Sequence, residues 1–404
     1  MKNVKKDFPI FKNNPGLVYL DSCATTQKPS NVINSIKDHL ESYYSNIHRG
    51  LYHLSEKSED AYIRSKKLIA DFLGVKKSEI IYTYNSTYAF NILAESLYYS
   101  GYLQKGDKIL LGIAEHHSNI VPWLMLKERF GIEVEFIGTN DDYDLDIDEF
   151  DKKYDEKTKL VALNYVSNVT GTIFDIKKIS KRLNEETLFV VDGSQAVPNF
   201  SINLHDIGCD FFVFTGHKVM ANTGIGVLWG KKQLLKKLNP SIGGGGSIKH
   251  VGKEDYESLD TVEGFEAGTP NLSGAVSLLA AFEYIRDIGG FDYIWDKEQS
   301  LVKYAIEGFE KRKDKVQLIG KQTQENRVGV FSFIIKNSNF SPIKFGEFMA
   351  MNNICLRCGG HCAHPYLDEM GAGGTCRISV YLYNDFEDLD KFFDVLDQFL
   401  DKFF

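Results

Sequence analysis

The sequence predicts an α/β protein in which a large domain with a mostly parallel sheet precedes a smaller α+β domain. Three observations support this prediction. Short apolar runs alternate with amphipathic segments through most of the chain. Several runs are apolar throughout, as in strands buried on both faces of a parallel sheet. Near residue 241 this alternation stops, and long helices follow a glycine-rich stretch.

Seven runs have the length and composition of strands. They lie at 79–84, 108–112, 134–138, 159–166, 188–192, 210–215 and 224–229. Between several of them lie segments with apolar residues at helical spacing, such as IVPWLMLKERF and DIKKISKRLNEE. Strands that alternate with helices form parallel pairs, so a mostly parallel seven-stranded sheet is expected.

The second part of the chain has a different pattern. The stretch IGGGGSIKHVGKEDYESLDTVEGFEAGTPN is glycine-rich and lacks a helical period, and two or three long helices follow over about 273–315. Strand-like RVGVFSFII, a helix at 342–353, strand-like CRISVYLY and a terminal helix complete the chain. We predict a large domain over 20–285 and a small domain made of 1–19 and 286–404.

Composition limits the possible partners. The chain has 404 residues, 43% of them apolar, and a net charge of −8. Duplex binding needs clustered basic residues, so no nucleic-acid partner is expected. The charged start MKNVKKDFPIFKNN and the lack of a long apolar run predict a cytoplasmic protein that does not cross a membrane.

Hydroxyl, imidazole and carboxyl groups follow three predicted strands. Ser86 and Thr87 stand between strand 79–84 and an amphipathic helix, where free backbone N–H groups favour an anion. A plain helix cap would use the same residues. His116 follows strand 108–112 and could be a metal ligand, an acid or a flat ring that stacks on a ligand. Asp192 and Gln195 follow strand 188–192, although Asp-Gly is also a common turn.

A lysine follows the next buried strand. Lys218 leaves strand 210–215 with Thr215 and His217 beside it. Desolvation lowers the pKa of an amine, which suits Schiff-base chemistry, whereas an ordinary surface lysine would need no such role. Pyridoxal phosphate (PLP) requires a phosphate cradle, a carboxylate, a flat ring and a lysine. The set of Ser86 and Thr87, Asp192, His116 and Lys218 therefore predicts a PLP site, and no nucleotide-binding glycine loop competes with it.

Most of the six cysteines lie near the end of the chain, where Cys355 and Cys358 form a CxxC pair before Cys362. This segment could be a zinc knuckle, a redox pair or a loop with one reactive thiol. ICLRC has the pattern of a strand, which would place Cys355 and Cys358 on opposite faces. That arrangement disfavours a metal knuckle, so no metal site is expected, and Cys23 and Cys209 are expected to pack.

Nine motifs in order resemble the cysteine desulfurases of the class V aminotransferase family, in particular the SUF-type (group II) branch. They are YLDSCATTQKP, NIHRG, AEHHSNIVPW, NYVSNVTG, VDGSQAV, FTGHK, FEAGTPN, HCAHP and CRIS. The resemblance implies the PLP-dependent transferase fold type I and conversion of L-cysteine to L-alanine. It also implies a homodimer and passage of sulfur to a SUF-type acceptor protein for iron–sulfur cluster assembly.

The resemblance also implies a role for each site residue. Lys218 would hold PLP through a Schiff base and His116 would stack on its ring, with both counted as catalytic together with Cys362, the sulfur-accepting thiol. Asp192 would face the pyridine nitrogen and Gln195 the phenolic oxygen. The remaining residues would bind ligand groups. The phosphate would be held by Ser86, Thr87, Thr215 and His217, and Thr269 would reach the phosphate of the neighbouring subunit. The substrate carboxylate would be held by Asn168 and Arg377.

Four positions depart from the family pattern. Ala221-Asn222 stands where Gly-Pro is usual, Ser86-Thr87-Tyr88 where Thr-Thr-Glu/Asp is usual, Gly360 where histidine is frequent, and Cys23 where a small residue is usual. Three alternatives to a desulfurase remain at this point. They are a selenocysteine lyase, another class V PLP enzyme that would not need Cys362, and a non-catalytic zinc-stapled interaction protein.

Overall fold

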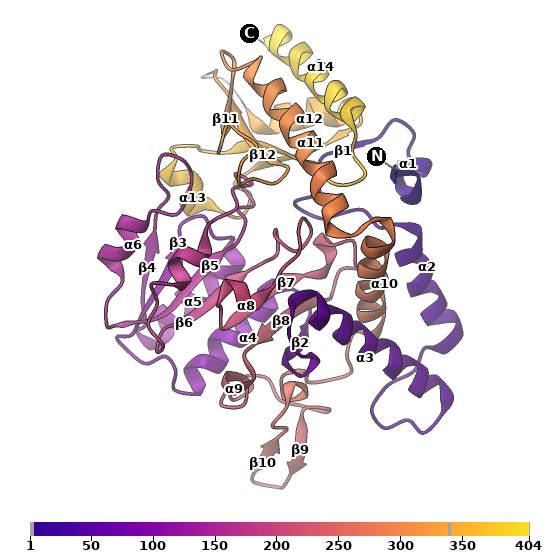
Figure 1. Cartoon of the computed structure of the whole chain (residues 1–404), viewed down its shortest axis with the longest axis vertical. Coiled ribbons are helices and arrows are strands. Elements are labelled where there is room, and N and C mark those ends of the chain that lie inside the picture. The colour runs from indigo at the N-terminus through magenta and orange to yellow at the C-terminus, as the bar shows by residue number, and fades with distance from the viewer. Residues whose placement is uncertain (1–3, 338–340, 404) are drawn as a thin grey trace.

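The computed structural model describes residues 4–337 and 341–403, and a seven-stranded sheet forms its centre (Figure 1). The strand order is β2-β8-β7-β6-β5-β3-β4. The neighbours from β7 to β4 run parallel, and β8 runs antiparallel to both β7 and β2. This confirms the predicted α/β class with a mostly parallel seven-stranded sheet. The strands are β2 (Ile80–Thr83), β3 (Lys108–Gly112), β4 (Glu133–Ile137), β5 (Thr158–Asn164), β6 (Leu188–Asp192), β7 (Phe211–Thr215) and β8 (Gly226–Gly230).

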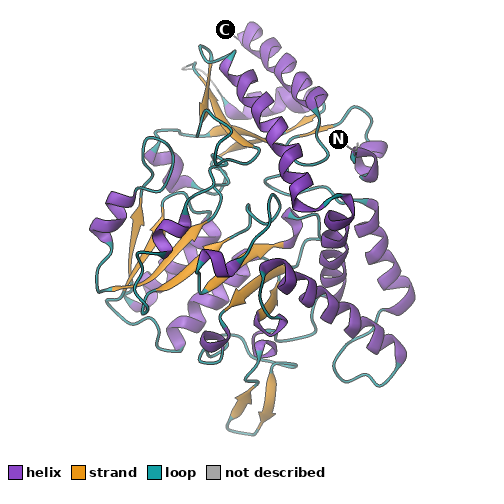
Figure 2. Cartoon of the chain, viewed as in Figure 1, coloured by secondary structure: helices purple, strands orange, loops and turns teal. Residues whose placement is uncertain are grey.

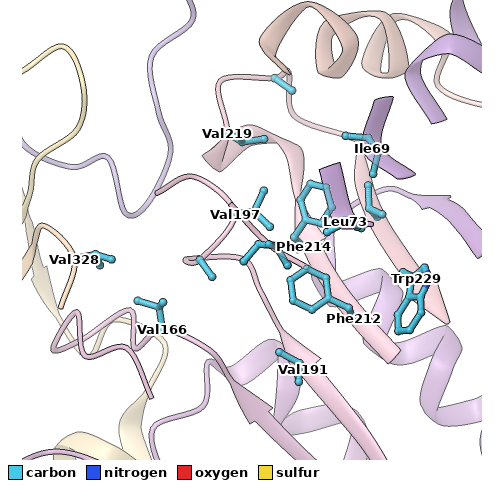
Figure 3. Packing of buried hydrophobic residues seen from close by; sticks show 14 of the residues in the cluster. Ile69, Leu73, Val166, Val191, Val197, Phe212, Phe214, Val219, Trp229 and Val328 are labelled. Carbon is cyan, nitrogen blue, oxygen red and sulfur yellow. The ribbon is translucent and has the colours of Figure 1, made fainter. Parts of the chain in front are cut away.

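Helices bury both faces of this sheet. Val191 of β6 packs in one apolar cluster with residues of α3 (His53–Leu73) (Figure 3). Its neighbour Val190 points to the other face and packs in a second cluster with residues of α4 (Ser86–Tyr99). Successive side chains of a strand point to opposite faces, so a strand covered on both sides has to be apolar throughout.

A second, four-stranded antiparallel sheet lies towards the C-terminal end of the chain (Figure 2). Its order is β11-β12-β15-β14, with strands β11 (Val316–Ile319), β12 (Val330–Ile335), β14 (Arg357–Gly359) and β15 (Thr375–Ser379). A third apolar cluster joins this sheet to α11 (Gly290–Glu310), α12 (Pro342–Met351) and α14 (Phe386–Phe403). The short strand β1 (Val18–Tyr19) pairs in parallel with β13 (Ile354–Cys355).

The segment ICLRC is not the single strand that its pattern suggested. It breaks at Leu356 into β13 and β14, and these belong to different sheets. Cys355 is half-buried and pairs through its backbone with Tyr19, whereas Cys358 faces Cys376 across β14 and β15. The break arises because the chain leaves one sheet and joins another within three residues.

The remaining elements surround these sheets. The helices are α1 (Pro9–Asn13), α2 (Ser30–Asp38), α5 (Val121–Phe130), α6 (Ile147–Lys153), α7 (Ile176–Ser180), α8 (Leu204–Ile207), α9 (Lys232–Leu235), α10 (Leu272–Ile288) and α13 (His364–Glu369). The glycine-rich stretch after 241 contains a projecting hairpin of β9 (Ile248–Val251) and β10 (Tyr256–Ser258) (Figure 1). The domain limits of 20–285, with 1–19 and 286–404, remain a prediction, and residues 1–3 and 404 lie outside the described part. None of the described helices has the length and hydropathy of a membrane span.

Candidate active site

A pocket of about 410 Å³ lies where several strands of the large sheet end. This volume falls in the range of small-ligand sites. The pocket collects residues that are far apart in the sequence, because parallel strands bring their carboxyl ends to one edge. The predicted site residues that line it are Ser86, Thr87, His116, Asn168, Asp192, Gln195, Thr215, His217, Lys218, Cys362 and Arg377.

Thr269 does not line this pocket. It borders a second pocket together with Tyr62, Tyr82 and Glu266. Its predicted contact with the phosphate of a neighbouring subunit therefore stays a prediction.

Lys218 ends a single helical turn, Gly216–Lys218, that follows β7 directly. Burial lowers the pKa of Lys218, and the nearby Cys23 and Asp192 oppose this shift in part. A lowered pKa increases the share of neutral amine near neutral pH, and only the neutral amine acts as a base or a nucleophile.

Asp192 is the last residue of β6 and is 5% exposed. Its Oδ1 accepts a hydrogen bond from the backbone N–H of Ser194 at 2.9 Å. Burial raises the pKa of Asp192, while Lys218 acts in the opposite direction. The strand end thus places a carboxyl group and an amine on the same pocket wall.

His116 is held as a neutral ring. Its Nδ1 accepts the backbone N–H of Ser118 at 3.1 Å and lies 2.9 Å from the Ser118 hydroxyl. Burial, with Lys218 and His117 nearby, lowers the pKa of His116 to about 3. Because Nδ1 accepts a hydrogen bond, the proton of the neutral ring resides on Nε2.

The start of α4 offers donors to an anion. Asn85 caps this helix by accepting the N–H of Tyr88 at 2.8 Å, and Ser86 and Thr87 form the first turn. The hydroxyls of Thr215 and Ser194 are buried and have no hydrogen-bond partner among the described residues. Buried hydroxyls are costly without a partner, so these two fit a ligand that brings its own acceptors, as PLP does. Ser194 was missed in the sequence because nothing distinguished it from a turn serine.

Arg377 and Asn168 form a second polar wall. The Nη1 of Arg377 donates to the Asn168 carbonyl at 2.9 Å, and its Nη2 lies 3.6 Å from Asp21 Oδ1. Within the described part of the chain, the Nε of Arg377 and the Oδ1 of Asn168 are buried without a hydrogen-bond partner. An arginine with a free edge suits a carboxylate, which accepts two parallel hydrogen bonds.

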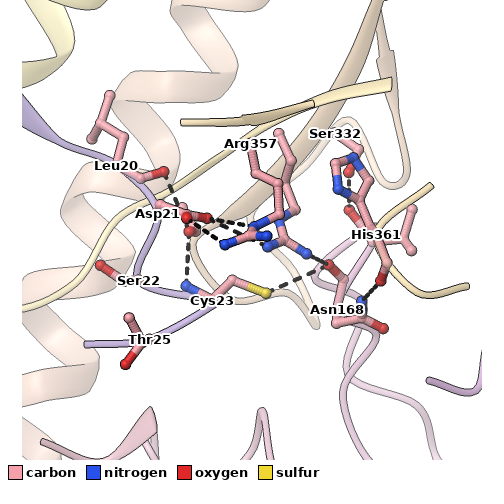
Figure 4. Close-up of polar contacts among 12 residues, drawn as sticks. Leu20, Asp21, Ser22, Cys23, Thr25, Asn168, Ser332, Arg357 and His361 are labelled. Atoms are coloured by element: carbon pink, nitrogen blue, oxygen red, sulfur yellow. Dashed lines mark hydrogen bonds and ion pairs between the residues drawn. The ribbon is translucent and has the colours of Figure 1, made fainter. Parts of the chain in front are cut away.

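Cys362 lies on an exposed loop between β14 and α13. Its carbonyl accepts the backbone N–H of His117 at 2.8 Å, and the carbonyl of His361 accepts Asn168 Nδ2 at 2.8 Å (Figure 4). His361 and Cys362 have φ of 48° and 55°, a left-handed conformation that non-glycine residues rarely adopt. Two long-range hydrogen bonds thus hold a tight turn that carries the thiol.

Cys23 places another thiol in this pocket, which the sequence did not predict. It is buried, as expected, but it lines the pocket. Gln195 Nε2 donates to both the carbonyl and the sulfur of Cys23 at 2.9 Å. Figure 4 shows the sulfur aimed at the carbonyl of Asn168, to which it donates at 3.5 Å. The only sequence signal was the replacement of a small residue within LDSCATTQKP.

Within residues 4–337 and 341–403, no group of three or more His, Cys, Asp or Glu side chains is placed to hold a metal ion.

Comparison with known proteins gives consistent matches. The family model Aminotransferase class-V matches residues 18–392. A probable cysteine desulfurase of Halalkalibacterium halodurans is 37% identical over 392 residues, which cover 96% of this chain and 95% of the relative. One from Staphylococcus epidermidis is 38% identical over 403 residues, or 98% and 96% of the two chains. The apo structure of a cysteine desulfurase from Thermococcus onnurineus NA1 superposes with a TM-score of 0.93 at 33% identity, covering 100% of this chain and 99% of the other.

Proposed function

The chain belongs to the cysteine desulfurases of the class V aminotransferase family, and we propose that it transfers the sulfur of L-cysteine to Cys362 as a persulfide. Enzymes of this family use PLP, and the fold is the PLP-dependent transferase fold type I. One observation carries the proposal. The backbone hydrogen bond from His117 to Cys362 holds an exposed thiol segment at the pocket that contains Lys218.

Each of the pocket residues would contact a different part of PLP. Asp192 would hold the pyridine nitrogen, Gln195 the phenolic oxygen, and His116 one face of the ring. The phosphate would take the free hydroxyl of Thr215 and the start of α4, with Ser86, Thr87 and His217 beside it. The unpaired hydroxyl of Thr215 supports this assignment.

Lys218 carries the proton transfers. When bound in this pocket, PLP would supply an electron sink for the pair that remains when the Cα–H bond of the substrate breaks. The Nζ of Lys218 takes this proton as a neutral amine, which its lowered pKa favours. The pKa of His116 is lowered to about 3, which makes its ring a weak base and leaves Lys218 as the base beside it.

Cys362 completes the reaction. Its thiolate attacks the sulfur of the substrate, the Cβ–S bond breaks, and a new S–S bond forms on Cys362. The electron pair of the broken bond stays with the carbon skeleton, which takes up protons and leaves as alanine. Arg377 and Asn168 would orient the substrate through its carboxylate. The carboxylate would accept from the Arg377 Nε, which has no partner among the described residues, and from the second N–H of Asn168 Nδ2, whose first donates to the His361 carbonyl.

The exposed position of Cys362 suits onward transfer of sulfur. A persulfide on an exposed loop is open to a second protein, so we extend the proposal to a sulfur-acceptor protein of the SUF type for iron–sulfur cluster assembly. The cytoplasmic location and the homodimer, with Thr269 serving the neighbouring site, belong to the same proposal. Selenocysteine lyase activity remains the alternative, because a selenol would fit the same residues.

The test is alanine release from L-cysteine with a reductant present, for the wild type and Cys362→Ala. We expect release by the wild type and a loss of at least about 10²-fold in the variant, since nucleophile removal has effects of this order or larger. Cofactor absorbance should be equal in both proteins. Cys355→Ser is the matched control, because Cys355 lies in β13 outside the pocket.

Two results would contradict the proposal. One is a wild type that binds PLP but releases no alanine. The other is a Cys362→Ala variant as active as Cys355→Ser. Equal or faster release from L-selenocysteine in both variants would favour the lyase alternative.

A further inference from the structure

Two cysteines form a close pair outside the sulfur chemistry proposed above. The sulfur atoms of Cys358 and Cys376 lie 2.8 Å apart, and the two residues are direct partners across the antiparallel strands β14 and β15. Cys358 is half-buried and Cys376 is fully buried. We propose that this pair is a redox site that hydrogen peroxide or a related hydroperoxide converts to a disulfide.

The two thiols lie against α12, and Cys358 also borders the pocket that contains Lys218. The Cys376 thiol is 3.8 Å from the carbonyl of Pro342, at the start of α12. A Cβ added to Gly346 of the same helix would come within 3.3 Å of the Cys358 sulfur. The neighbouring pair, Arg357 and Arg377, extends to the opposite face, where both contact Asp21. The two thiols therefore occupy the helix-covered face of the sheet, opposite to the side chains of Arg357 and Arg377.

The geometry is close to that of a disulfide. A disulfide has an S–S distance of about 2.05 Å, and it tolerates Cα separations of about 4.4–6.8 Å, which include the spacings of facing residues in antiparallel strands. The sulfurs need to approach by less than about 1 Å. β14 is a three-residue strand at the edge of its sheet, so it can shift at little cost.

The reaction balances with peroxide as the only added reagent. The more accessible Cys358 thiol attacks peroxide, becomes a sulfenic acid and releases water. Cys376 then displaces the hydroxyl group of the sulfenic acid as a second water, and the S–S bond forms. The pair loses two electrons and two protons, and the peroxide is reduced.

The consequence lies in the segment between the two cysteines, which are 18 positions apart. This segment contains the Cys362 turn, α13 and the return to β15. A disulfide would join both of its ends, so it would restrict the segment that presents Cys362. The oxidised protein should therefore exchange amide hydrogens more slowly over 359–374.

The experiment treats the holoenzyme with a small excess of hydrogen peroxide and maps its peptides by mass spectrometry. Cys362→Ser is included, because its exposed thiol competes for the oxidant. We expect a linked peptide joining Cys358 and Cys376 in both proteins, its reversal by dithiothreitol, and slower hydrogen exchange over 359–374. Cys358→Ser is the matched variant and should give neither the link nor the slower exchange. Cys376→Ser should also give no link. Cys376 is fully buried, so this variant disturbs the packing more than Cys358→Ser does.

Other outcomes would overturn the inference. These are separate oxidation of Cys358 and Cys376 to sulfinic acids, a link between Cys358 and Cys362, or a linked pair with unchanged exchange. The readouts are covalent mass and hydrogen exchange, so they hold whether or not the protein releases alanine.

Discussion

Lys218 and Cys362 line the same pocket, but the protein holds them in different ways. Lys218 follows β7, an inner strand of the large sheet, and its turn forms backbone hydrogen bonds with Thr26 and Ile225. Cys362 sits on an exposed loop in a left-handed turn that depends on contacts to His117 and Asn168. The difference suits the tasks proposed for them, since a base must be fixed and desolvated, whereas a sulfur carrier must reach solvent.

The largest effect should come from removing the fixed amine. Lys218→Ala should lower alanine release by about 10²–10⁴-fold or more, because a positioned general base contributes about this much. The measurement is single-turnover alanine formation with added PLP. Lys232→Ala, an exposed lysine after β8, is the control and should match the wild type. Equal losses in the two variants would contradict the role of Lys218.

A smaller loss of activity is expected from a change at Cys23, which lies in the pocket between Gln195 and Asn168. Cys23→Ala leaves the Gln195 amide with the Cys23 carbonyl as its remaining partner there. Loss of one hydrogen bond of about 1 kcal/mol corresponds to a fall of about fivefold in alanine release. The cofactor absorbance should shift as well, and Cys23→Ser should restore part of both signals. If neither signal changes, Cys23 only packs.

The loop that carries Cys362 should tolerate substitution with a smaller loss of activity. A Cβ on Gly360 would come within 2.4 Å of the His364 ring, which explains glycine at a position where the family often has histidine. Gly360→Ala should reduce alanine release by about twofold to fivefold, at the low end of overpacking costs, because the exposed His364 can move. Adding His364→Ala should restore the rate. A double variant as slow as Gly360→Ala would show that the clash is not the cause.

The smallest effect is expected on the pH dependence of stability, through a buried carboxyl group of α11. Glu298 of α11 is buried and accepts the N–H of Gly329 at 2.9 Å, while its Oε2 has no partner in residues 4–337 and 341–403. Burial raises the pKa of Glu298 to about 8 from 4.5. The folded state therefore binds a proton that the unfolded state releases between these values, so the stability from this group falls as the pH rises from 4.5 to 8.

Thermal unfolding tests this sign. Relative to Glu298→Gln, which cannot ionise, the wild type should lose Tm steadily from pH 5 to pH 8 and then level off. Glu307→Gln, on the exposed side of α11, should follow the wild type. Parallel Tm curves for the wild type and Glu298→Gln would show that Glu298 does not carry a raised pKa.

Much of the pocket was predictable because strand ends are a local property. The apolar strand before Asp192 and the one before Lys218 fix both residues to one edge of a parallel sheet. The order of the motifs then identified the family without any contact information. Buried strands have to be apolar on both faces, which makes them visible in the sequence.

The contacts of the second sheet were not predictable in the same way. ICLRC had the pattern of one strand, yet its two halves joined different sheets, since pairing partners are chosen by the whole fold. That choice placed Cys358 against Cys376 rather than beside Cys355. Local spacing carries no information on which distant strand a residue will meet.

The sequence by itself determined the α/β class, the order of the strands along the chain, and the chemical groups at their ends. Tertiary structure alone decided two contacts. Gln195 donates to the Cys23 sulfur, and the backbone N–H of His117 donates to the Cys362 carbonyl and holds its turn. The physical reason is how far along the chain each interaction acts. Propensity and burial act within a few residues of the chain, whereas these hydrogen bonds join segments that only the finished packing of both sheets brings together.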